Sequence, residues 1–344
     1  MGGSPCQGFS RAGKQLNFLD SRSKLFFDFI KAKEILKPKY FLLENVKMKK
    51  EWQNIISKYM GVEPIEINST LLSAQKRPRV YWTNIPGIEM PKDRDIKLLD
   101  ILEDEVDERY FRLRDDEKKI FNYCQNKLRV KQATKKGYDI ATYGDSINLS
   151  CPNSNTRRGR VGKGKANTLD TQCNQAVYIK TYKDYRIKKY QNKASCLTGG
   201  GHSGGNHSDM DILVFGDGII RRYTEIECER LQTLPDNYTE GVSSTQRYKT
   251  LGNGWTAEVA AHIISHIPET YLHTVVSLFD GISCGQVALE RADKDYNQYY
   301  ASEIDKYAMQ IAQKNYPHTM QLGDVTKIDW NHFEDRIKLN SKVS

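Results

Sequence analysis

The first hundred residues alternate between apolar positions at helical spacing and short, continuous apolar runs. The first helical pattern is formed by Leu25, Phe26, Phe29, Ile30 and Leu36. This spacing predicts an amphipathic helix over residues 24–37, closed by Pro38. The apolar run at 40–43 predicts a strand buried on both faces, as in parallel sheets. A second helix at 51–59 and strands at 65–69 and 80–83 continue the alternation, which predicts an α/β fold.

Between residues 131 and 218 the pattern becomes polar and rich in Gly, Asn, Ser and Thr, with short strands and no convincing helix. The later chain resumes the alternation, with helices expected at 224–231, 255–267 and 305–315 and strands at 275–279, 299–303 and up to 324. We therefore expect a small, irregular domain inserted between two parts of a larger one. The expected segments are residues 1–125, 126–220 and 221–344.

Composition narrows the class of protein. Of the 344 residues, 38% are hydrophobic and 28% charged, which is typical of a soluble globular chain. No run approaches the ~18 apolar residues of a membrane span, and no signal pattern opens the chain, so we expect no membrane association. Seven scattered cysteines without a Cys-x-x-Cys pair argue against disulfides and a metal site and favour the cytoplasm. The net charge of +9 suits a polyanionic partner.

Two short segments carry candidate covalent chemistry. Cys6 follows Pro5 among small residues that allow close backbone approach to a ligand. Glu44 follows the apolar run at 40–43, where a carboxylate in a cleft could act as an acid. Taken alone, Cys6 reads equally well as a small hydrophobic residue near a terminus.

A second set of candidates lies at three consecutive strand ends. The sequence Phe279-Asp280-Gly281-x-x-x-Gly285 is a glycine-bearing turn that opens a helix. Glu303 ends the next strand, about 20 residues on, where an acid can accept both ribose hydroxyls of an adenosine ligand. Asp324 ends the following strand, placed to meet the adenine. The alternative is that these acids only cap helices.

These residues belong to a larger set of motifs that covers nearly the whole chain. The set comprises Gly2-Gly3-Ser4-Pro5-Cys6-Gln7, Glu44-Asn45-Val46, Gln75-Lys76-Arg77-Pro78-Arg79, Arg222-Tyr223-Thr224, Glu227-Cys228, Arg230-Leu231-Gln232, Leu251-Gly252-Asn253-Gly254-Trp255 and Ser277-Leu278-Phe279-Asp280-Gly281. In this set the chain resembles the DNA cytosine-5 methyltransferases, with wording close to the vertebrate de novo enzymes. The resemblance implies a Rossmann-like sheet dependent on S-adenosyl-L-methionine, with a smaller inserted target-recognition domain.

The resemblance also implies roles for individual residues. Cys6 would be the thiolate that adds to C6 of a flipped-out cytosine, and Glu44 would hold N3 and the exocyclic amine. Arg77 and Arg79 would orient the base and the Glu44 carboxylate. The implied cofactor-binding residues are Pro5, Asn253, Trp255, Phe279, Asp280, Gly281, Gly285, Glu303, Ile304, Asp324 and Val325.

The implied partner is double-stranded DNA, bound by a protein expected to be a monomer. Residues 157–165 contain five basic residues and no acid, separated by glycines, which favours contacts to phosphates or base edges. The expected DNA-binding residues are Gln7, Ser10, Gln75, Arg157, Arg158, Arg160, Lys163, Gly200 and His202. The alternative for the basic segment is a disordered loop.

The motif order is unusual, because such enzymes begin with the cofactor motifs and reach Pro-Cys later. The chain therefore resembles a circular permutant cut just before the nucleophile loop, which compact domains tolerate. The family's buried strand before Pro-Cys is here represented only by residues 1–4. Ile337, Leu339 and Val343 alternate with polar residues and offer a second source for it. Two other functions stay open: methylation of cytosine in RNA, as in a tRNA-modifying relative, and a catalytically silent DNA-binding or partner-stimulating protein.

Overall fold

The computed structural model describes residues 1–4, 24–180, 214–216 and 218–340. The chain divides into two compact units. The larger comprises Met1–Ile96, Asp170–Gln172 and Glu229–Ser344, and the smaller comprises Lys97–Leu169 and Cys173–Cys228. The smaller unit thus begins at Lys97, upstream of the composition change near residue 126. The assignment of these segments to catalysis and target recognition stays a prediction.

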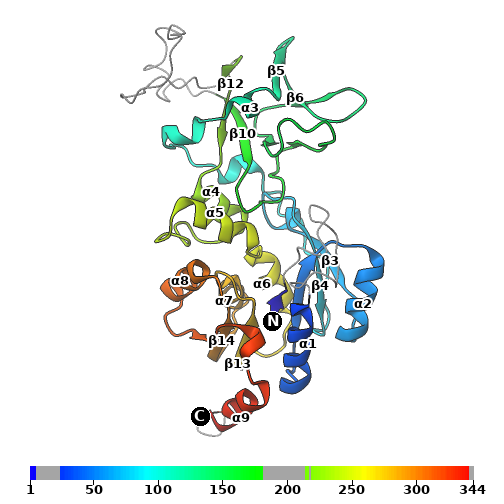
Figure 1. Ribbon diagram of the computed structural model, residues 1–344, viewed down its shortest axis with the longest axis vertical. Coiled ribbons are helices and arrows are strands. Elements are labelled where there is room, and N and C mark those ends of the chain that lie inside the picture. The colour runs from blue at the N-terminus through cyan, green and yellow to red at the C-terminus, as the bar shows by residue number, and fades with distance from the viewer. Residues whose placement is uncertain (5–23, 181–213, 217, 341–344) are drawn as a thin grey trace. The chain divides into compact units, whose positions relative to one another are not determined.

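The larger unit is built on a seven-stranded mixed sheet in the order β15-β14-β13-β1-β2-β4-β3 (Figure 1). Its strands are β1 (Gly2–Gly3), β2 (Leu42–Val46), β3 (Ile65–Asn68), β4 (Pro78–Thr83), β13 (Tyr271–Leu278), β14 (Asp295–Ser302) and β15 (Met320–Gln321). Strand β4 pairs antiparallel with both of its neighbours, whereas the other described pairings are parallel. This sheet, with helices on both faces, confirms the predicted α/β, Rossmann-like fold.

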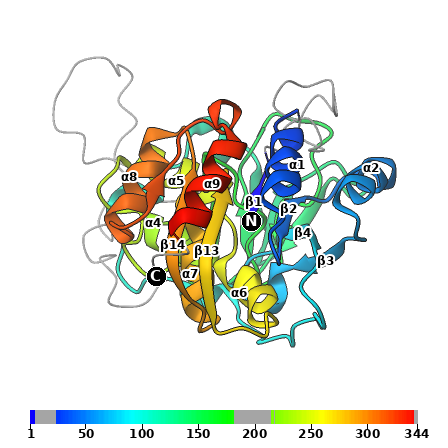
Figure 2. The same ribbon diagram turned by 90° about the horizontal axis from the view of Figure 1, so that it is seen from below.

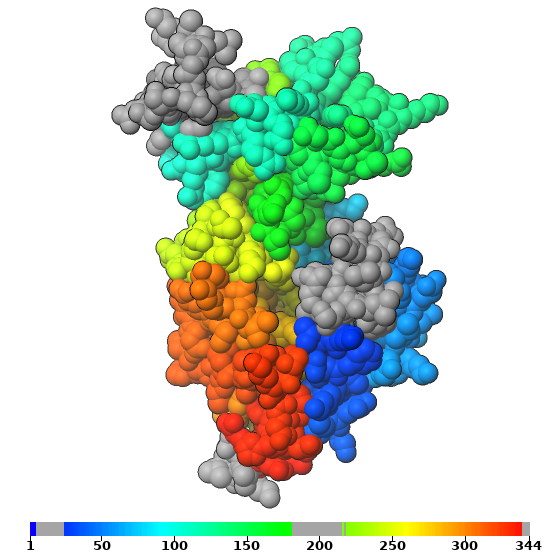
Figure 3. All heavy atoms as spheres, viewed as in Figure 1, coloured from blue at the N-terminus to red at the C-terminus, as the bar shows by residue number. Residues whose placement is uncertain are grey.

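Helices cover both faces of the sheet, as the continuous apolar runs in the strands require (Figure 2). One face packs against α1 (Leu25–Leu36), α2 (Lys50–Met60) and α9 (Trp330–Asn340), through a core that includes Phe26, Leu43 and Trp82. The other face packs against α6 (Ala257–Ser265) and α7 (Cys284–Arg291). Helices α1 and α9, far apart in sequence, lie side by side on the surface (Figure 3).

The remaining helices of the larger unit connect these layers. They are α5 (Ser244–Asn253), α8 (Lys306–Asn315) and the short 3-10 turns η2 (Ser69–Leu71) and η6 (Val325–Lys327). Helix α4 (Glu225–Leu231) runs across the boundary between the two units.

The smaller unit is mostly β, as its polar, glycine-rich sequence predicts. One sheet has the order β11-β12-β10-β8-β9 and the other the order β5-β6-β7. Their strands are β5 (Phe121–Cys124), β6 (Lys127–Lys131), β7 (Tyr138–Ala141), β8 (Ser146–Asn148), β9 (Val161–Gly162), β10 (Gln175–Lys180), β11 (Val214–Phe215) and β12 (Gly218–Arg222). Short helical turns precede them at η3 (Leu98–Ile101), η4 (Glu108–Phe111) and α3 (Asp115–Lys118).

The strand before Pro5-Cys6 is formed by the start of the chain itself. Gly2 pairs in parallel with Leu278 of β13 on one side and with Leu43 of β2 on the other. The suggestion that the C-terminal segment supplies this strand is wrong for the described residues, because 330–340 form helix α9 and Ile337 packs against the core that includes α1. Val343 lies outside the described residues. Two glycines suffice here because a neighbouring backbone lies where a larger side chain would go: a Cβ at Gly2 would lie 2.6 Å from Leu278 O.

Candidate active site

A carboxylate and a guanidinium are paired across strands β2 and β4. Glu44 lies opposite Tyr81 and Val46 lies opposite Arg79, so Glu44 and Arg79 extend from the same face of the sheet. Arg79 Nε lies 2.8 Å from Glu44 Oε1, and each side chain is only 12% exposed. Because few waters reach this pair, the charged hydrogen bond holds the Glu44 carboxylate in one orientation.

The start of the chain lies directly beside this carboxylate. Gly3 is paired with Glu44, and a Cβ at Gly3 would lie 3.2 Å from Glu44 Oε2 and 2.7 Å from Trp255 Nε1. Asn45 Nδ2 donates to the carbonyl oxygen of Ser4 at 3.3 Å and to its hydroxyl at 3.1 Å. Strand β2 therefore fixes the segment that leads into the nucleophile motif. Pro5, Cys6, Gln7 and Ser10 themselves lie outside the described residues.

Arg77 contacts the backbone at the end of α5. Its Nη2 donates to Gly252 O at 3.0 Å and to Gly254 O at 2.8 Å, and the residue is 3% exposed. These bonds fix the turn that carries Asn253, which is exposed, and Trp255, which is half-buried beside Gly3. Arg77 is thus a positioning residue in this structure, and direct contact with the base stays a prediction.

The turn after β13 has an unusual backbone. Phe279, Gly281 and Ser283 all have positive φ, at 59°, 60° and 62°. Such values are strained for the two residues with side chains and need support from their surroundings. The Asp280 carboxylate provides it by accepting hydrogen bonds from Ser283 Oγ at 2.6 Å and from Tyr299 Oη at 2.7 Å. Burial raises the pKa of Asp280, with the three hydroxyls of Ser277, Ser283 and Tyr299 acting in the opposite direction.

Glu303, directly after β14, ties this turn to the next strand. Its Oε2 accepts the Gly281 N–H at 2.8 Å, and its Oε1 accepts the N–H groups of Ile304 and Asp305 at 2.7 and 2.8 Å. Ile304 is 74% exposed, which is high for a large apolar residue at a strand end. A half-exposed carboxylate beside an exposed apolar side chain fits a ligand with ribose hydroxyls and a flat base.

Asp324 and its neighbours complete this edge of the sheet. Asp324 caps η6 by accepting the Thr326 N–H at 3.0 Å and its hydroxyl at 2.8 Å, and these bonds lower the pKa of Asp324. Val325 and Gly285 are both buried, and a Cβ at Gly285 would lie 2.9 Å from Met1 Cε. Packing accounts for both of these residues, whose cofactor contacts stay predictions.

Gln75 does not fit the DNA contact expected for it. It is fully buried, and its Nε2 donates to Leu231 O at 3.1 Å. Gln232 is also fully buried and donates to Leu251 O at 2.6 Å and Gly254 O at 3.2 Å. Gln232, Asn45 and Tyr299 were not among the residues predicted to form the site. Gln232 and Asn45 lie within the quoted motifs, so their position was the available signal.

The basic segment of the smaller unit contains residues of different kinds. Arg158 is exposed and Arg157 is half-buried. Arg160 is 1% exposed, and its guanidinium donates to the carbonyls of Asn148, Ser150 and Cys151 at 2.7 to 3.0 Å. Arg160 therefore supports its own unit and does not fit the expected DNA contact. Lys163 forms a 2.8 Å ion pair with Asp145.

Two further expectations concern parts or properties that this structure covers incompletely. Gly200 and His202 lie outside the described residues. Within the described ranges, no group of three or more His, Cys, Asp or Glu side chains is arranged to hold a metal ion. No helix in those ranges is long and apolar enough to cross a membrane.

The sheet order and the carboxylates at its strand ends define the class: a Rossmann-like enzyme that binds a nucleoside-containing cofactor. The family of C-5 cytosine-specific DNA methylases matches residues 1–269 and 273–339. The chain belongs to this family.

Individual relatives are more distant. The chain is 28% identical over 288 residues to the type II methyltransferase M1.ScrFI of Lactococcus lactis subsp. cremoris, covering 80% of this chain and 62% of the relative. It is 26% identical over 284 residues to the type II methyltransferase M.HhaI of Haemophilus parahaemolyticus, covering 77% and 74%. The orphan methyltransferase M.SPRI of Bacillus phage SPR is 24% identical over 363 residues, covering 79% and 83%. The chain thus spans less than two thirds of the first of these relatives.

Proposed function

We propose that this protein methylates C5 of cytosine in double-stranded DNA, with S-adenosyl-L-methionine as methyl donor. The observation that carries the proposal is the Glu44–Arg79 pair, fixed next to the backbone that leads into Pro5-Cys6. Family membership and the relatives named as DNA methyltransferases support DNA over RNA as the substrate. A silent DNA-binding protein would have no use for this half-buried pair.

The proposed chemistry begins on the cytosine ring. The Cys6 thiolate forms a bond to C6 while Glu44 donates a hydrogen bond or proton at N3, so that electron density moves to C5. The bound cofactor supplies an electrophilic methyl group at its sulfonium. After C5 has taken the methyl group, loss of the C5 proton lets the C6–S bond break and returns the thiolate. Glu44 must keep its orientation throughout, which the hydrogen bond from Arg79 provides.

The cofactor would be held at the ends of β13, β14 and β15. Glu303 would bind ribose hydroxyls, and Ile304 would pack on the adenine. The strained turn at Phe279–Gly281 would present its backbone to the ligand. Asp280 serves this turn from behind, because its carboxylate is engaged by Ser283 and Tyr299.

We also infer that the motif order is a circular permutation. Two observations support it: the family match is interrupted only at residues 270–272, and β1 pairs in parallel with β13, from the other end of the chain. A monomeric state and a cytoplasmic location stay predictions.

The deciding experiment measures methyl transfer from radiolabelled cofactor to duplex DNA and, separately, to tRNA. We expect incorporation into DNA, loss of turnover in Cys6→Ser, and nearly unchanged DNA binding, because a hydroxyl is a far weaker nucleophile of similar size. DNA containing 5-fluorocytosine should trap a covalent adduct at Cys6. Transfer to tRNA but not to DNA, or transfer by Cys6→Ser above a few per cent, would contradict the proposal.

A further inference from the structure

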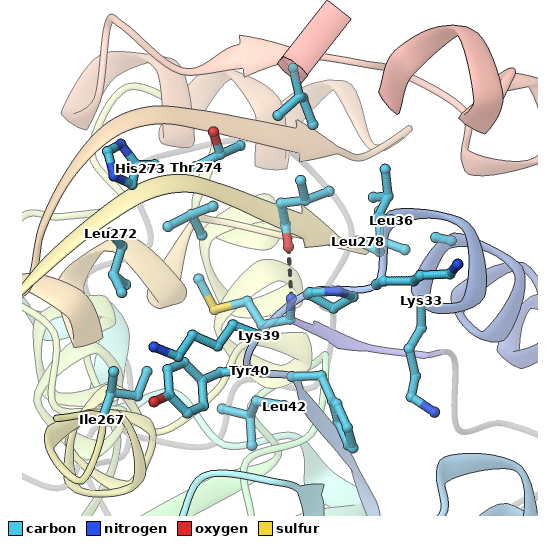
Figure 4. Close-up of a pocket in the computed structure, with 18 of the residues that line it drawn as sticks. Lys33, Leu36, Lys39, Tyr40, Leu42, Ile267, Leu272, His273, Thr274 and Leu278 are labelled. Atoms are coloured by element: carbon cyan, nitrogen blue, oxygen red, sulfur yellow. Dashed lines mark hydrogen bonds between the residues drawn. The ribbon is translucent and has the colours of Figure 1, made fainter. Parts of the chain in front are cut away.

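A cavity of about 680 Å³ lies in the middle of the large sheet, below the start of the chain (Figure 4). It is lined by residues of β13, of the segment entering β2, and of helices α1, α6 and α9, all within the larger unit. The cavity is distant in the fold from the strand ends that carry Glu44 and Glu303, because it lies at the opposite, N-terminal ends of the parallel strands. The proposed methyl transfer therefore makes no use of it.

The cavity has the position of an incomplete strand. Strand β13 is eight residues long and pairs with β14 from Tyr271 to Leu278. On its other side, the described pairing reaches only Leu278. The last bonds on this side run from the Met1 ammonium to Val276 O at 2.7 Å and from Leu278 N–H to Met1 O at 2.9 Å. The sheet is therefore open between β13 and β2 below Met1.

The open edge presents unused backbone groups. The peptide groups of Val276 and Leu278 face β1, and orientation alternates along a strand, so those of Leu272 and Thr274 face the same way. Within the described ranges, no backbone group pairs with Leu272 or Thr274 on this side. Polar backbone groups at a buried edge favour any segment that completes the ladder.

The lining of the cavity defines the side chains that such a segment needs. Ala32 and Leu36 of α1 line it on one face of the sheet, and Ile264 and Ile267 of α6 and the loop after it line it on the other (Figure 4). A strand with apolar residues on both faces matches these walls, as in the interior of any parallel sheet. From Tyr271 to Val276 there is room for roughly five extended residues, or about 17 Å.

The inner end of the cavity is positively charged. The Met1 ammonium is buried there, and among the described residues its hydrogen bond goes to Val276 O. Burial lowers the pKa of this ammonium to about 5, with the Asp280 carboxylate acting in the opposite direction. A carboxylate placed beside the ammonium would restore the favourable environment that burial removes.

We propose that this cavity binds an extended apolar peptide, which adds as a parallel strand between β13 and β2 with its C-terminal carboxylate beside the Met1 ammonium. Strand addition of this kind takes its affinity from main-chain hydrogen bonds and its selectivity from side-chain pockets. The parallel direction follows from β1, because a strand that continues β1 downward ends where Met1 begins. The partner is thus the C-terminal end of an apolar polypeptide segment.

The test uses the whole protein and a synthetic peptide, acetyl-Lys-Thr-Val-Ile-Val-Ile with a free carboxylate. Amide exchange followed by nuclear magnetic resonance should slow at least tenfold at Thr274 and Val276 on saturation. The amides of Val275 and Ser277 should change little, because they already face β14. Saturating peptide should also raise the thermal midpoint by roughly 5 °C, as expected for a ligand at about 100 times its Kd.

Two controls make the result specific. Ala32→Phe places a ring in the cavity and should abolish binding, whereas Lys31→Phe, at an exposed position of the same helix outside the lining, should not. The same peptide with a C-terminal amide, tested on the unaltered protein, should bind at least tenfold more weakly. Absence of protection at Thr274 and Val276, equal protection of the four amides, or equal binding of the amide peptide would overturn the proposal.

Discussion

Within the site, the role of Arg79 can be separated from general charge effects. In Arg79→Met the side chain keeps its apolar stem but loses the donors that hold Glu44. A hydrogen bond to a charged group contributes about 1.5 to 3 kcal/mol, so kcat/KM for methyl transfer should fall roughly tenfold to a hundredfold. Cofactor affinity, measured by calorimetry, should stay close to that of the unaltered protein.

Lys47→Met is the matched control, at the residue that follows strand β2. Lys47 forms a 2.8 Å ion pair with Glu66, but the two side chains are 49% and 45% exposed. Exposed pairs contribute little, so this change should leave kcat/KM within about twofold. Equal losses in the two variants would mean that Arg79 acts through net charge and not through the orientation of Glu44.

A second residue-scale prediction concerns Glu303. In Glu303→Gln one oxygen becomes an NH2 group, which cannot accept all three backbone N–H groups that the carboxylate now accepts. Affinity for S-adenosyl-L-methionine should fall by roughly 1 to 3 kcal/mol, measured by calorimetry. The sequence methylated in DNA should not change. Unaltered cofactor affinity would remove Glu303 from the cofactor site.

At the scale of elements, β1 is two glycines long because its neighbours leave no space for side chains. In Gly3→Ala the new methyl would lie 2.7 Å from Trp255 Nε1 and 3.2 Å from Glu44 Oε2, so one of these groups must move. We expect both a lower free energy of unfolding, measured in urea, and a loss of methyl transfer larger than the loss of stability explains.

Gly61→Ala provides the comparison. Gly61 ends α2 with a φ of 76°, and a Cβ added there would have no atom within 4 Å, so its replacement costs about 1 kcal/mol of backbone strain alone. Methyl transfer at saturating substrate should be retained. If Gly3→Ala behaved like Gly61→Ala, close packing of β1 against Glu44 would not matter for catalysis.

The same elements show what the sequence could and could not predict. Helix α1 and strand β3 were predicted within one or two residues, because their apolar periodicity is local. Strand β13 begins at Tyr271, four residues before the predicted start, since the alternating residues 271–274 gain their strand pairing from β14. Helices α5 and α9 were not predicted, because polar faces obscure their pattern and packing supplies most of a helix's stability.

At the scale of the whole molecule, the basic segment of the smaller unit determines how DNA affinity is tested. Charge and spacing made Arg157, Arg158 and Arg160 equivalent in the sequence. Burial separates them, because the Arg160 guanidinium donates to three backbone carbonyls while Arg158 is exposed. No pattern of residues predicts which member of a basic run turns inward, since that depends on where the carbonyls of 148–151 lie.

Arg158→Ala and Arg160→Ala should therefore fail in different ways. Loss of one phosphate contact at Arg158 should reduce the slope of log K against log salt concentration by about 0.9, with thermal stability unchanged. Arg160→Ala leaves three buried carbonyls without their donor and should lower the free energy of unfolding by several kcal/mol, at about 1 to 3 kcal/mol for each unsatisfied group. Fluorescence anisotropy over a range of salt concentrations and urea denaturation of each variant separate the two effects. An unchanged salt slope in Arg158→Ala would place the DNA contacts elsewhere in the chain, and unchanged stability in Arg160→Ala would return that residue to the candidates for DNA contact.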